Sequence, residues 1–403
     1  MKAPTNFIVS PRWLVPVVPR RAPLENHSVV VQAGKIAEIL PATDADQKYQ
    51  GLPKYELKDH LLIPGLINMH GHAAMTMLRG YADDLPLKQW LEQEIWPIES
   101  KWVDAEFVKD GTMLAIVEML LSGTTTFVDQ YFFPNSVAEA AAETGIRSLV
   151  GFPILEFPSN WAKDSDEYMQ KGLDLYDQYR NHSLIKFSFA PHAPYTVSDD
   201  SFKNIVKYNN ELELPLQVHL HETKLEVEES IELHGKRPLQ RLYDLGVLGP
   251  NTLCVHMTQL IDEDMELLKQ TNTNVVHCPS SNLKLASGFT PVKELLDRDI
   301  NLCIGTDSAA SNNSLDMLAE IRLASLLAKG SSGDPTTLDA QSSLEAATIN
   351  AAKALGLETE IGSIEVGKQA DMVAIKLDSP ESIPTYNPVS QLIYAANSNN
   401  FTH

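Results

Sequence analysis

The sequence predicts an α/β fold, a (β/α)8 TIM-type barrel with a small β-sandwich domain built from both ends of the chain. Three observations lead to this expectation. Eight strand-length apolar runs follow the opening segment, helix-like segments separate them, and most of the notable histidines stand at the ends of the runs. We expect the N-terminal part of the small domain at residues 1–62, the barrel at 63–361 and the C-terminal part of the small domain at 362–403.

The apolar runs are short and rich in Val, Ile, Leu, Phe or Thr, as buried strands are. They are Leu61–Met69, Thr124–Asp129, Ile146–Phe152, Ile185–Ala190, Leu214–Leu220, Thr252–His256, Asn274–Cys278 and Asn301–Thr306. The helix-like segments include Ala105–Leu121, Ser136–Glu143, Asp164–Arg180, Asp199–Asn210, Asp262–Lys269 and Pro291–Asp297. A doubly wound open sheet would also alternate in this way, but the number of runs and the polar residues that end them favour the barrel.

The two ends of the chain have a different pattern. Short strands separated by turns are expected at Ser28–Val31 and Lys35–Leu40, around Ala33-Gly34, and again within Gly362–Leu377. Because these segments flank the barrel in sequence, we expect them to meet in one small β domain.

Composition restricts the class of function. The formal net charge is -21 and there is no basic tract, so a polyanion such as nucleic acid is not the expected partner. An ordinary acidic protein surface explains this charge equally well. No apolar run approaches the length of a membrane span, and Pro11, Pro16 and Pro19 interrupt the N-terminal apolar stretch. We therefore expect a cytoplasmic protein that acts on a small molecule and has no membrane partner. A homo-oligomer is expected as well, although composition does not determine the oligomeric state.

Three histidines and one aspartate form a candidate metal site. His70 and His72 flank Gly71 after an apolar run, and residues i and i+2 of a strand point to the same side. His219 lies near the end of LPLQVHLHE, where it shares its strand face with His221, and Asp307 ends NLCIGTD. Three imidazoles and a carboxylate suit a divalent ion such as Zn2+. Taken alone, a His-x-His pair can be core packing and Asp307 can be a helix cap.

Two further residues could carry proton transfer. Glu222 stands three residues after His219, and a carboxylate beside a metal is suited to acid–base work. His256 ends the sixth apolar run, where it could orient or deprotonate a water molecule. Glu222 could equally open the next helix, and His256 could be a structural histidine. The cysteines Cys254, Cys278 and Cys303 lie in apolar runs without a CxxC pair, which excludes the cysteine-ligated zinc deaminase pattern.

Five segments together resemble the amidohydrolase superfamily, specifically its 5'-methylthioadenosine/S-adenosylhomocysteine deaminases. They are PGLINMHGHAAMTMLRGYADDLPLKQWLEQEIWPIE, PHAPYT, VHLHET, VHCPSSNLKLASG and GTDSAASNNSLDMLAEIRLASLL. The resemblance covers about residues 30 to 400. His-x-His with a later His and Asp is common among amidohydrolases, whereas the first segment combined with PHAPYT and GTDSAASNN is much more specific.

The resemblance implies a role for each matching residue. His70, His72, His219 and Asp307 would bind one divalent metal ion, zinc; Glu222 would protonate the substrate ring; and His256 and Asp307 would act on the attacking water. Trp90 would pack near the base or sugar, Glu99 would bind the ribose hydroxyls, His192 would contact the sugar or ring, and Ser311 would lie by the substrate tail. Trp90 as a core aromatic and Glu99 as a solvated helix residue are the structural alternatives.

The expected activity is hydrolytic deamination of 5'-methylthioadenosine and S-adenosylhomocysteine, with adenosine as a further candidate, to the inosine analogues. The alternative is another amidohydrolase, such as a guanine, cytosine or triazine deaminase or dechlorinase, for which Glu99 would have no ribose to hold. Two-metal relatives need a bridging lysine at the end of the fourth strand, and Lys186 stands at its start, so one metal is expected.

Three features carry less specific expectations. We expect residues 155–166 to form a mobile loop over the site, and Arg147 receives no role. Relatives usually continue with a strand of the W-V-N-G-K kind, whereas this chain stops at Asn400-Phe401-Thr402-His403. We therefore expect a truncated or missing tail and an incomplete small domain.

Overall fold

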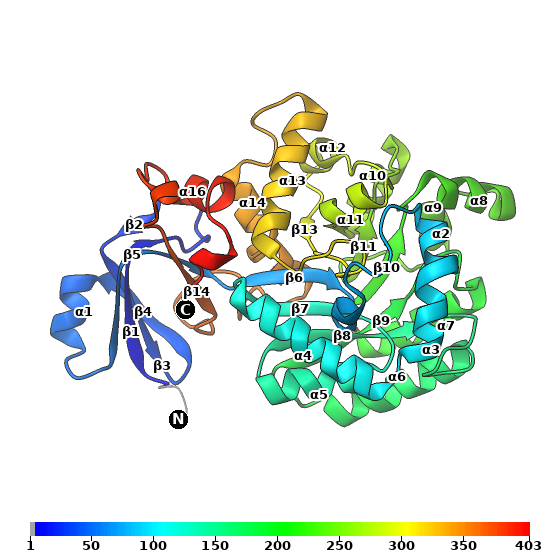
Figure 1. Ribbon diagram of the computed structural model, residues 1–403, viewed down its shortest axis with the longest axis horizontal. Coiled ribbons are helices and arrows are strands. Elements are labelled where there is room, and N and C mark those ends of the chain that lie inside the picture. Colours follow the sequence, from blue (N-terminus) through cyan, green and yellow to red (C-terminus); the bar gives the residue numbers. More distant parts are fainter. Residues whose placement is uncertain (1–4) are drawn as a thin grey trace.

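The computed structural model describes residues 5–403, which form a barrel and a smaller β domain (Figure 1). The barrel has eight parallel strands that are neighbours in chain order from β6 to β13. Their bounds are β6 Leu66–Gly71, β7 Thr124–Gln130, β8 Arg147–Ile154, β9 Ile185–Pro191, β10 Leu216–Leu220, β11 Thr252–His256, β12 Asn274–His277 and β13 Leu302–Ile304. The predicted (β/α)8 barrel is confirmed, and the open-sheet alternative is not what the chain adopts.

The first apolar run was wrongly assigned to a single barrel strand. Its first residues, Leu61 to Pro64, end strand β5 (Lys54–Pro64) of the other sheet, and β6 begins only at Leu66. Gly65 separates the two strands, and any side chain there would collide with Thr125. The apolar end of β5 and the start of β6 make one continuous apolar run, so hydrophobicity alone could not divide it.

Helices follow the barrel strands and surround them. Their bounds are α4 Ala105–Leu121, α5 Pro134–Thr144, α6 Ser165–Tyr179, α7 Asp199–Leu212, α8 Lys224–His234, α9 Pro238–Asp244, α10 Asp262–Thr271, α11 Pro279–Lys284, α12 Val292–Asp297, α13 Met317–Ser332, α14 Ala340–Ala346 and α15 Ile349–Ala354. Several begin at a side chain that accepts a hydrogen bond from the first-turn backbone, as Asp104, Asp164 and Ser198 do. Such caps satisfy amide groups that the helix itself leaves free.

Between β6 and β7, the chain makes a long excursion over the mouth of the barrel. It begins with the 3-10 turn η1 (Ala73–Leu78). Three further elements, α2 (Leu87–Gln89), the π-helical η2 (Trp90–Ile95) and α3 (Trp96–Trp102), then follow one another without a break. π-helical turns cost regular hydrogen bonding and are often found at functional sites. This segment supplies Trp90 and Glu99 to the pocket described below.

The small domain is built from both ends of the chain, as predicted. Its strands are β1 Phe7–Leu14, β2 Leu24–Glu25, β3 His27–Gln32, β4 Lys35–Pro41, β5 and β14 Met372–Lys376, in the order β14-β5-β1-β3-β4 with β2 beside β1. Among the described residues these strands form one mixed sheet rather than two facing sheets. Helix α1 (Ala42–Lys48) covers one face, where Ala45 packs with Ile8 and Val30.

The C-terminal residues connect the two parts of the molecule. Helix α16 (Pro388–Tyr394) packs on α13 and α14 of the barrel (Figure 1). Arg322 donates a 2.8 Å hydrogen bond to the carbonyl of Ile393. The chain then returns to the small sheet, where Phe401 pairs antiparallel with Ile375. Because these residues contact both parts, the division at residues 362–403 stays a prediction, as does the division at residue 62.

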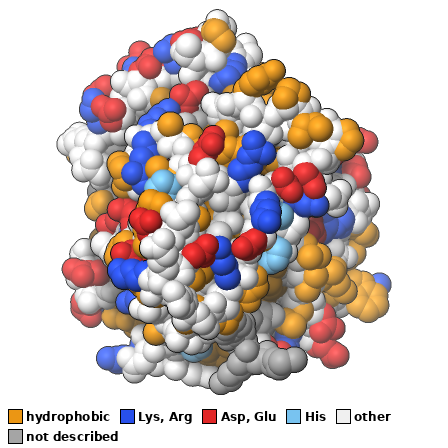
Figure 2. Space-filling view, turned by 90° about the vertical axis from the view of Figure 1, so that its left-hand side faces the viewer, with side chains coloured by type: hydrophobic (Ala, Val, Ile, Leu, Met, Phe, Trp, Pro, Cys, Tyr) orange, Lys and Arg blue, Asp and Glu red, His pale blue; other side chains and the backbone are white. Residues whose placement is uncertain are grey.

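One face of the molecule is shown in Figure 2, on the side of the small β domain. Acidic, basic and apolar side chains are intermixed there, and the basic side chains do not form a continuous band across it. Within the described residues 5–403, no helix is both long enough and apolar enough to cross a bilayer.

Candidate metal centre and active site

Three histidines meet at the mouth of the barrel. His70 lies at the end of β6, His72 directly follows that strand, and His219 lies on β10. One ring nitrogen from each lies within 4.8 Å of the other two. The glycine between the first two histidines belongs to β6, and both rings reach the same centre. The predicted grouping of these three residues is therefore what the structure shows.

Each histidine is oriented by an oxygen atom behind it. The Nδ1 of His219 lies 2.8 Å from the carbonyl of His192, and the Nδ1 of His72 contacts the carbonyl of Gln130. The Nδ1 of His70 lies 3.3 Å from Gln217 Oε1, and the amide nitrogen of Gln217 donates to the carbonyl of Asp129 at 2.9 Å. Since an oxygen acceptor needs a proton on Nδ1, the Nε2 atoms of His70 and His219 present lone pairs to the common centre.

This arrangement calls for a cation. The Nε2 atoms of His70 and His219 lie 3.1 Å apart, and two lone pairs facing each other at that distance repel. Burial lowers the pKa of His70 to about 4 and holds that of His219 well below its usual value, so both rings are neutral at pH 7. Neutral imidazole is the form that binds metals. The donor set therefore fits a divalent ion such as zinc.

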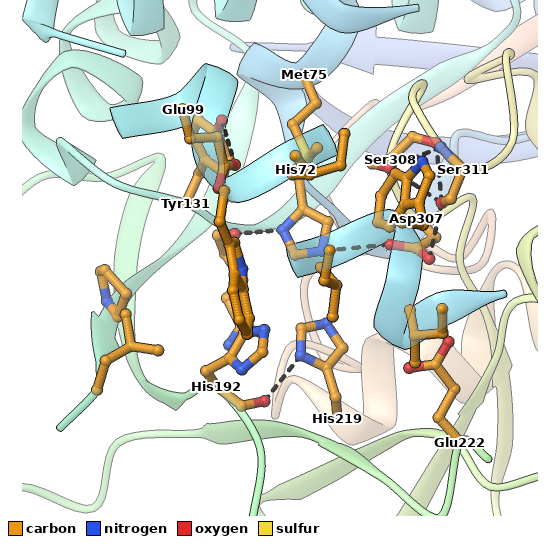
Figure 3. Close-up of a pocket in the computed structure, with 18 of the residues that line it drawn as sticks. His72, Met75, Glu99, Tyr131, His192, His219, Glu222, Asp307, Ser308 and Ser311 are labelled. Carbon is orange, nitrogen blue, oxygen red and sulfur yellow. Dashed lines mark hydrogen bonds and ion pairs between the residues drawn. The ribbon is translucent and has the colours of Figure 1, made fainter. Parts of the chain in front are cut away.

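Asp307 supplies a carboxylate to the same centre. It follows β13, and its Oδ1 lies 3.2 Å from His72 Nε2 and 3.5 Å from His70 Nε2. Its other oxygen accepts a hydrogen bond from Ser281 at 2.5 Å. It also accepts one from Ser311 at 3.1 Å (Figure 3). These hydroxyls fix the carboxylate with one oxygen directed at the histidines. Ser311 thus contacts Asp307 and also lines the pocket, where it was predicted to lie by the substrate tail.

Glycine is required where the barrel closes. Strands β6 and β13 are its first and last, and they come together beside His70. A Cβ atom on Gly305 would lie 2.7 Å from the backbone nitrogen of His70, closer than such atoms approach. The closure is made by Asn68, whose amide donates to Thr306 Oγ1 at 2.7 Å, and by the Asp307 N–H, which donates to the His70 carbonyl at 3.0 Å.

Glu222 and His256 lie together beside this group. Glu222 follows β10 and His256 ends β11, and Oε2 of the first lies 3.7 Å from Nε2 of the second. Asn282 orients His256 through a 2.8 Å hydrogen bond at Nδ1, and Ser287 lies 3.3 Å from Glu222 Oε1. Burial, and next the charge of Asp307, raise the pKa of Glu222 to about 8. The carboxyl therefore carries a proton at neutral pH.

A second buried carboxyl lies on the opposite side of the histidines from Glu222 (Figure 3). Glu99, on α3, accepts a 2.7 Å hydrogen bond from the hydroxyl of Tyr131. Burial raises its pKa to about 7. It is not the solvated helix residue that the alternative interpretation required, because only 9% of it is exposed. Trp90 is buried too, and its indole N–H donates to the Ala82 carbonyl at 3.1 Å.

All predicted site residues except His70 line one pocket, whose empty space of about 790 Å³ is partly open to solvent. His192 directly follows β9, and its Nδ1 lies 2.9 Å from Thr196 Oγ1. Leu155 and Phe157 of the 155–166 segment line the pocket as well, so this segment does lie at the site. Its mobility stays a prediction. Arg147 begins β8 and lies 3.9 Å from Glu360, so it does not line this pocket.

The chain matches the amidohydrolase family over residues 61–402. A 5-methylthioadenosine/S-adenosylhomocysteine deaminase from Saccharophagus degradans is 50% identical over 402 residues, covering 100% of this chain and 90% of that protein. The chain belongs to the amidohydrolase family. It is a metal-dependent hydrolase that acts on carbon–nitrogen bonds.

Two solved structures extend this comparison. An adenosine deaminase from Xanthomonas campestris with bound zinc is 46% identical, with a TM-score of 0.97, and the match covers 98% of this amidohydrolase and 90% of that chain. An atrazine chlorohydrolase from Arthrobacter aurescens complexed with zinc has a TM-score of 0.90 at 21% identity, covering 98% and 93%. The second likeness shows the shared fold alone.

Sequence reasoning about this amidohydrolase missed the supporting residues. Gln217, Asn282, Ser281 and Tyr131 orient His70, His256, Asp307 and Glu99 respectively. Gln217 lies two residues before His219 on β10, so strand alternation could have placed both on one face. Ser281 and Asn282 lie on α11 and Tyr131 directly follows β7, and nothing in their local sequence indicates a partner. The backbone carbonyls that orient His72 and His219 leave no sequence signal at all.

Two histidines near the site do not enter it. His221 was expected to share a strand face with His219, and this is wrong. It lies beyond the end of β10 with a φ of 52°, its Nε2 accepts the Leu239 N–H at 3.0 Å, and its Nδ1 lies 3.1 Å from the Gln259 carbonyl. His277, which ends β12, is buried outside the pocket lining, and neither ring nitrogen has a hydrogen-bond partner among residues 5–403.

Proposed function

We propose that this amidohydrolase deaminates the adenine ring of 5'-methylthioadenosine and S-adenosylhomocysteine, with adenosine as a further candidate. The supporting observation is the arrangement of one pocket. The histidine group is flanked on one side by the protonated Glu222 with His256 and on the other by the buried Glu99. The named relatives act on nucleosides of this class or on adenosine.

His70, His72, His219 and Asp307 would hold one divalent ion, zinc, between the three Nε2 atoms and Oδ1. When bound, such an ion lowers the pKa of a water molecule from about 15.7 to about 7 and so supplies a nucleophile at neutral pH. Lys186 is the exposed second residue of β9 rather than a residue at its carboxyl end, which supports a single ion.

The protein residues move the protons of the reaction. Glu222 donates its proton to the ring nitrogen beside the amino-bearing carbon, which makes that carbon electrophilic. The oxygen of water forms a bond to this carbon, and Asp307 accepts one water proton, which His256 steers. That proton passes to the amino group, the carbon–nitrogen bond breaks and ammonia leaves. The second water proton, on the new hydroxyl group, returns to Glu222 as the ring carbonyl forms. Ser287 and Asn282 hold Glu222 and His256 in position for these transfers.

Binding of the nucleoside is assigned to the other wall of the pocket. Glu99 would accept hydrogen bonds from the ribose hydroxyls, and Tyr131 fixes its carboxyl for this purpose. Trp90 would pack on the base or sugar, and His192 would contact the sugar or ring from the end of β9. Ser311 would lie by the substrate tail, although its hydrogen bond to Asp307 supports an orienting role as well.

The alternative activities, on guanine, cytosine or triazines, use the same barrel. A free base has no ribose, so they give no reason for burying a carboxyl at Glu99. The likeness to the atrazine chlorohydrolase is at the level of fold. A panel of 5'-methylthioadenosine, S-adenosylhomocysteine, adenosine, adenine, guanine and cytosine, with ammonia release as the readout, separates these activities. Reaction with the free bases alone would overturn the nucleoside assignment.

Replacement of Glu222 tests the mechanism. We expect Glu222→Gln to lower kcat for the thionucleosides by about 100- to 10,000-fold, because the amide cannot supply the proton. Metal content and melting temperature should match those of the wild type. Glu228→Gln, on the exposed side of α8, is the matched control and should retain full activity. Normal turnover by Glu222→Gln would remove Glu222 from the mechanism.

The cytoplasmic location, the homo-oligomeric state and the absence of nucleic-acid and membrane partners stay predictions.

A further inference from the structure

A second, larger pocket, with about 1950 Å³ of empty space that is partly open to solvent, adjoins the pocket that holds the histidine group. We call this second pocket the vestibule. Six uncharged residues line both spaces. They are Leu87, Leu91, Trp96, Phe157, Leu285 and Tyr195. A substrate bound in the pocket therefore has an apolar passage to the vestibule, and the passage suits a thioether chain.

Most charged residues that line the vestibule already have partners within the fold. Arg241 donates to Asp199 at 2.7 Å and to two backbone carbonyls. Glu226 accepts the backbone N–H groups of His221 and Glu222, and Glu156 accepts from Ser198 and Ser201. These groups are held in place by the structure and are not available to a ligand.

Lys88 and Glu229 differ from these residues. Lys88 belongs to α2 and Glu229 to α8, and both line the vestibule. Their side chains form a 2.8 Å ion pair between the two helices. The side chains are 54% and 39% exposed, and such half-exposed pairs add little to stability. The pair can therefore open to admit another ion pair at small cost.

We propose that the vestibule binds the α-amino acid end of a 5'-homocysteinyl nucleoside, with Lys88 pairing with its carboxylate and Glu229 with its ammonium group. This inference rests on the proposed function. A zwitterion inserted between the two residues replaces one ion pair by two, so neither Lys88 nor Glu229 loses an oppositely charged partner. A 5'-methylthio group ends in the apolar passage and carries no charge to the vestibule. Lys88 and Glu229 are thus specificity-determining residues for the longer substrate.

The test compares kcat/KM for ammonia release from S-adenosylhomocysteine and 5'-methylthioadenosine with the zinc-loaded full chain. We expect Lys88→Met to lower kcat/KM for S-adenosylhomocysteine by about 3- to 10-fold and to leave that for 5'-methylthioadenosine within about twofold. Lys88→Arg should retain most of the activity on both substrates. Lys224→Met is the matched control, because Lys224 also lines the vestibule but pairs with Glu228 of its own helix.

An analogue that lacks the carboxylate sharpens the assignment of the two charges. The 5'-(3-aminopropylthio) derivative of adenosine keeps the ammonium group alone, so Lys88→Met should not weaken its turnover and Glu229→Gln should. Equal loss for both thionucleosides in Lys88→Met, or no loss for either, would overturn the role of the vestibule while leaving the deaminase activity in place. Failure of the wild type to release ammonia from any adenine nucleoside would overturn the proposed function and this inference together.

Discussion

The chain contains two His-x-His segments close to the barrel mouth, and the structure uses them differently. Both residues of His70-Gly71-His72 belong to the metal group, whereas only the first residue of His219-Leu220-His221 does. His221 turns away with a left-handed backbone and donates or accepts its hydrogen bonds within the protein, at Leu239 and Gln259. Spacing alone is therefore no guide to ligation. What distinguishes the segments is where each Nε2 points once Nδ1 has found its oxygen partner.

The largest effect expected from this comparison concerns His72 and His221. We expect His72→Ala to lose the metal ion and to lower kcat by more than about 1000-fold, because the donor set falls to two histidines and a carboxylate. His221→Ala should retain the metal and most of the activity but lose about 1 to 3 kcal/mol of stability, since it strands a buried backbone N–H. Metal analysis, turnover and urea unfolding give the three readouts. Metal loss in His221→Ala would contradict the difference between the segments.

A smaller effect is expected at Gln217, which orients His70. Gln217→Leu removes the acceptor at Nδ1, so the His70 ring can rotate or change its tautomer. We expect the dissociation constant for zinc to rise about 10- to 100-fold, as is typical for residues that support a ligand. Competition with a chelator measures this constant. Gln259→Leu is a suitable comparison, because His221 is contacted by the Gln259 backbone carbonyl, which the substitution keeps. Equal affinity in Gln217→Leu and the wild type would show that the orienting oxygen is dispensable.

The smallest effect concerns Glu320, a buried carboxyl on α13 that accepts hydrogen bonds from neighbouring segments and is not one of the proposed metal ligands. Glu320 accepts hydrogen bonds from the Ser280 N–H at 3.2 Å and the Asn312 side chain at 2.8 Å, and burial raises its pKa to about 7. Because the pKa of Glu320 is higher in the folded protein than in the unfolded chain, protonation of this carboxyl adds to the free energy of unfolding. That contribution is complete below the unfolded pKa of about 4.5 and is lost as the pH rises to about 7.

Glu320→Gln removes this titration. Between pH 5 and pH 7.5 we expect the melting temperature of the wild type to fall relative to that of Glu320→Gln, by about 2 to 4 °C. Glu263→Gln, on the exposed side of α10, is the control and should follow the wild type at every pH. Parallel melting curves for the wild type and Glu320→Gln would mean that Glu320 has the same proton occupancy when folded and unfolded.

The sequence predicted the barrel and the ligand group for physical reasons that can be named. Alternating apolar runs and helices determine the layers, and polar residues at strand ends must meet at one barrel mouth, which brought His70, His219 and Asp307 together. It failed where one apolar run held two strands, at Leu61–Met69, and where a strand ended before His221. Hydrophobicity does not mark either point. Orienting groups such as the His192 carbonyl could not be predicted from the sequence, because every residue has a backbone carbonyl.

The closure of the barrel has a consequence for how the protein is made. Asn68 and Thr306, which join the first strand to the last, are 238 positions apart in the chain. The Asp307 N–H reaches the His70 carbonyl across the same seam. During synthesis, the full set of four donors cannot exist until the last barrel strand has left the ribosome and joined the first. Contacts between such distant residues form slowly. If the proposed ligand set is correct, a metal ion held by all four residues would require a chain whose barrel is already complete.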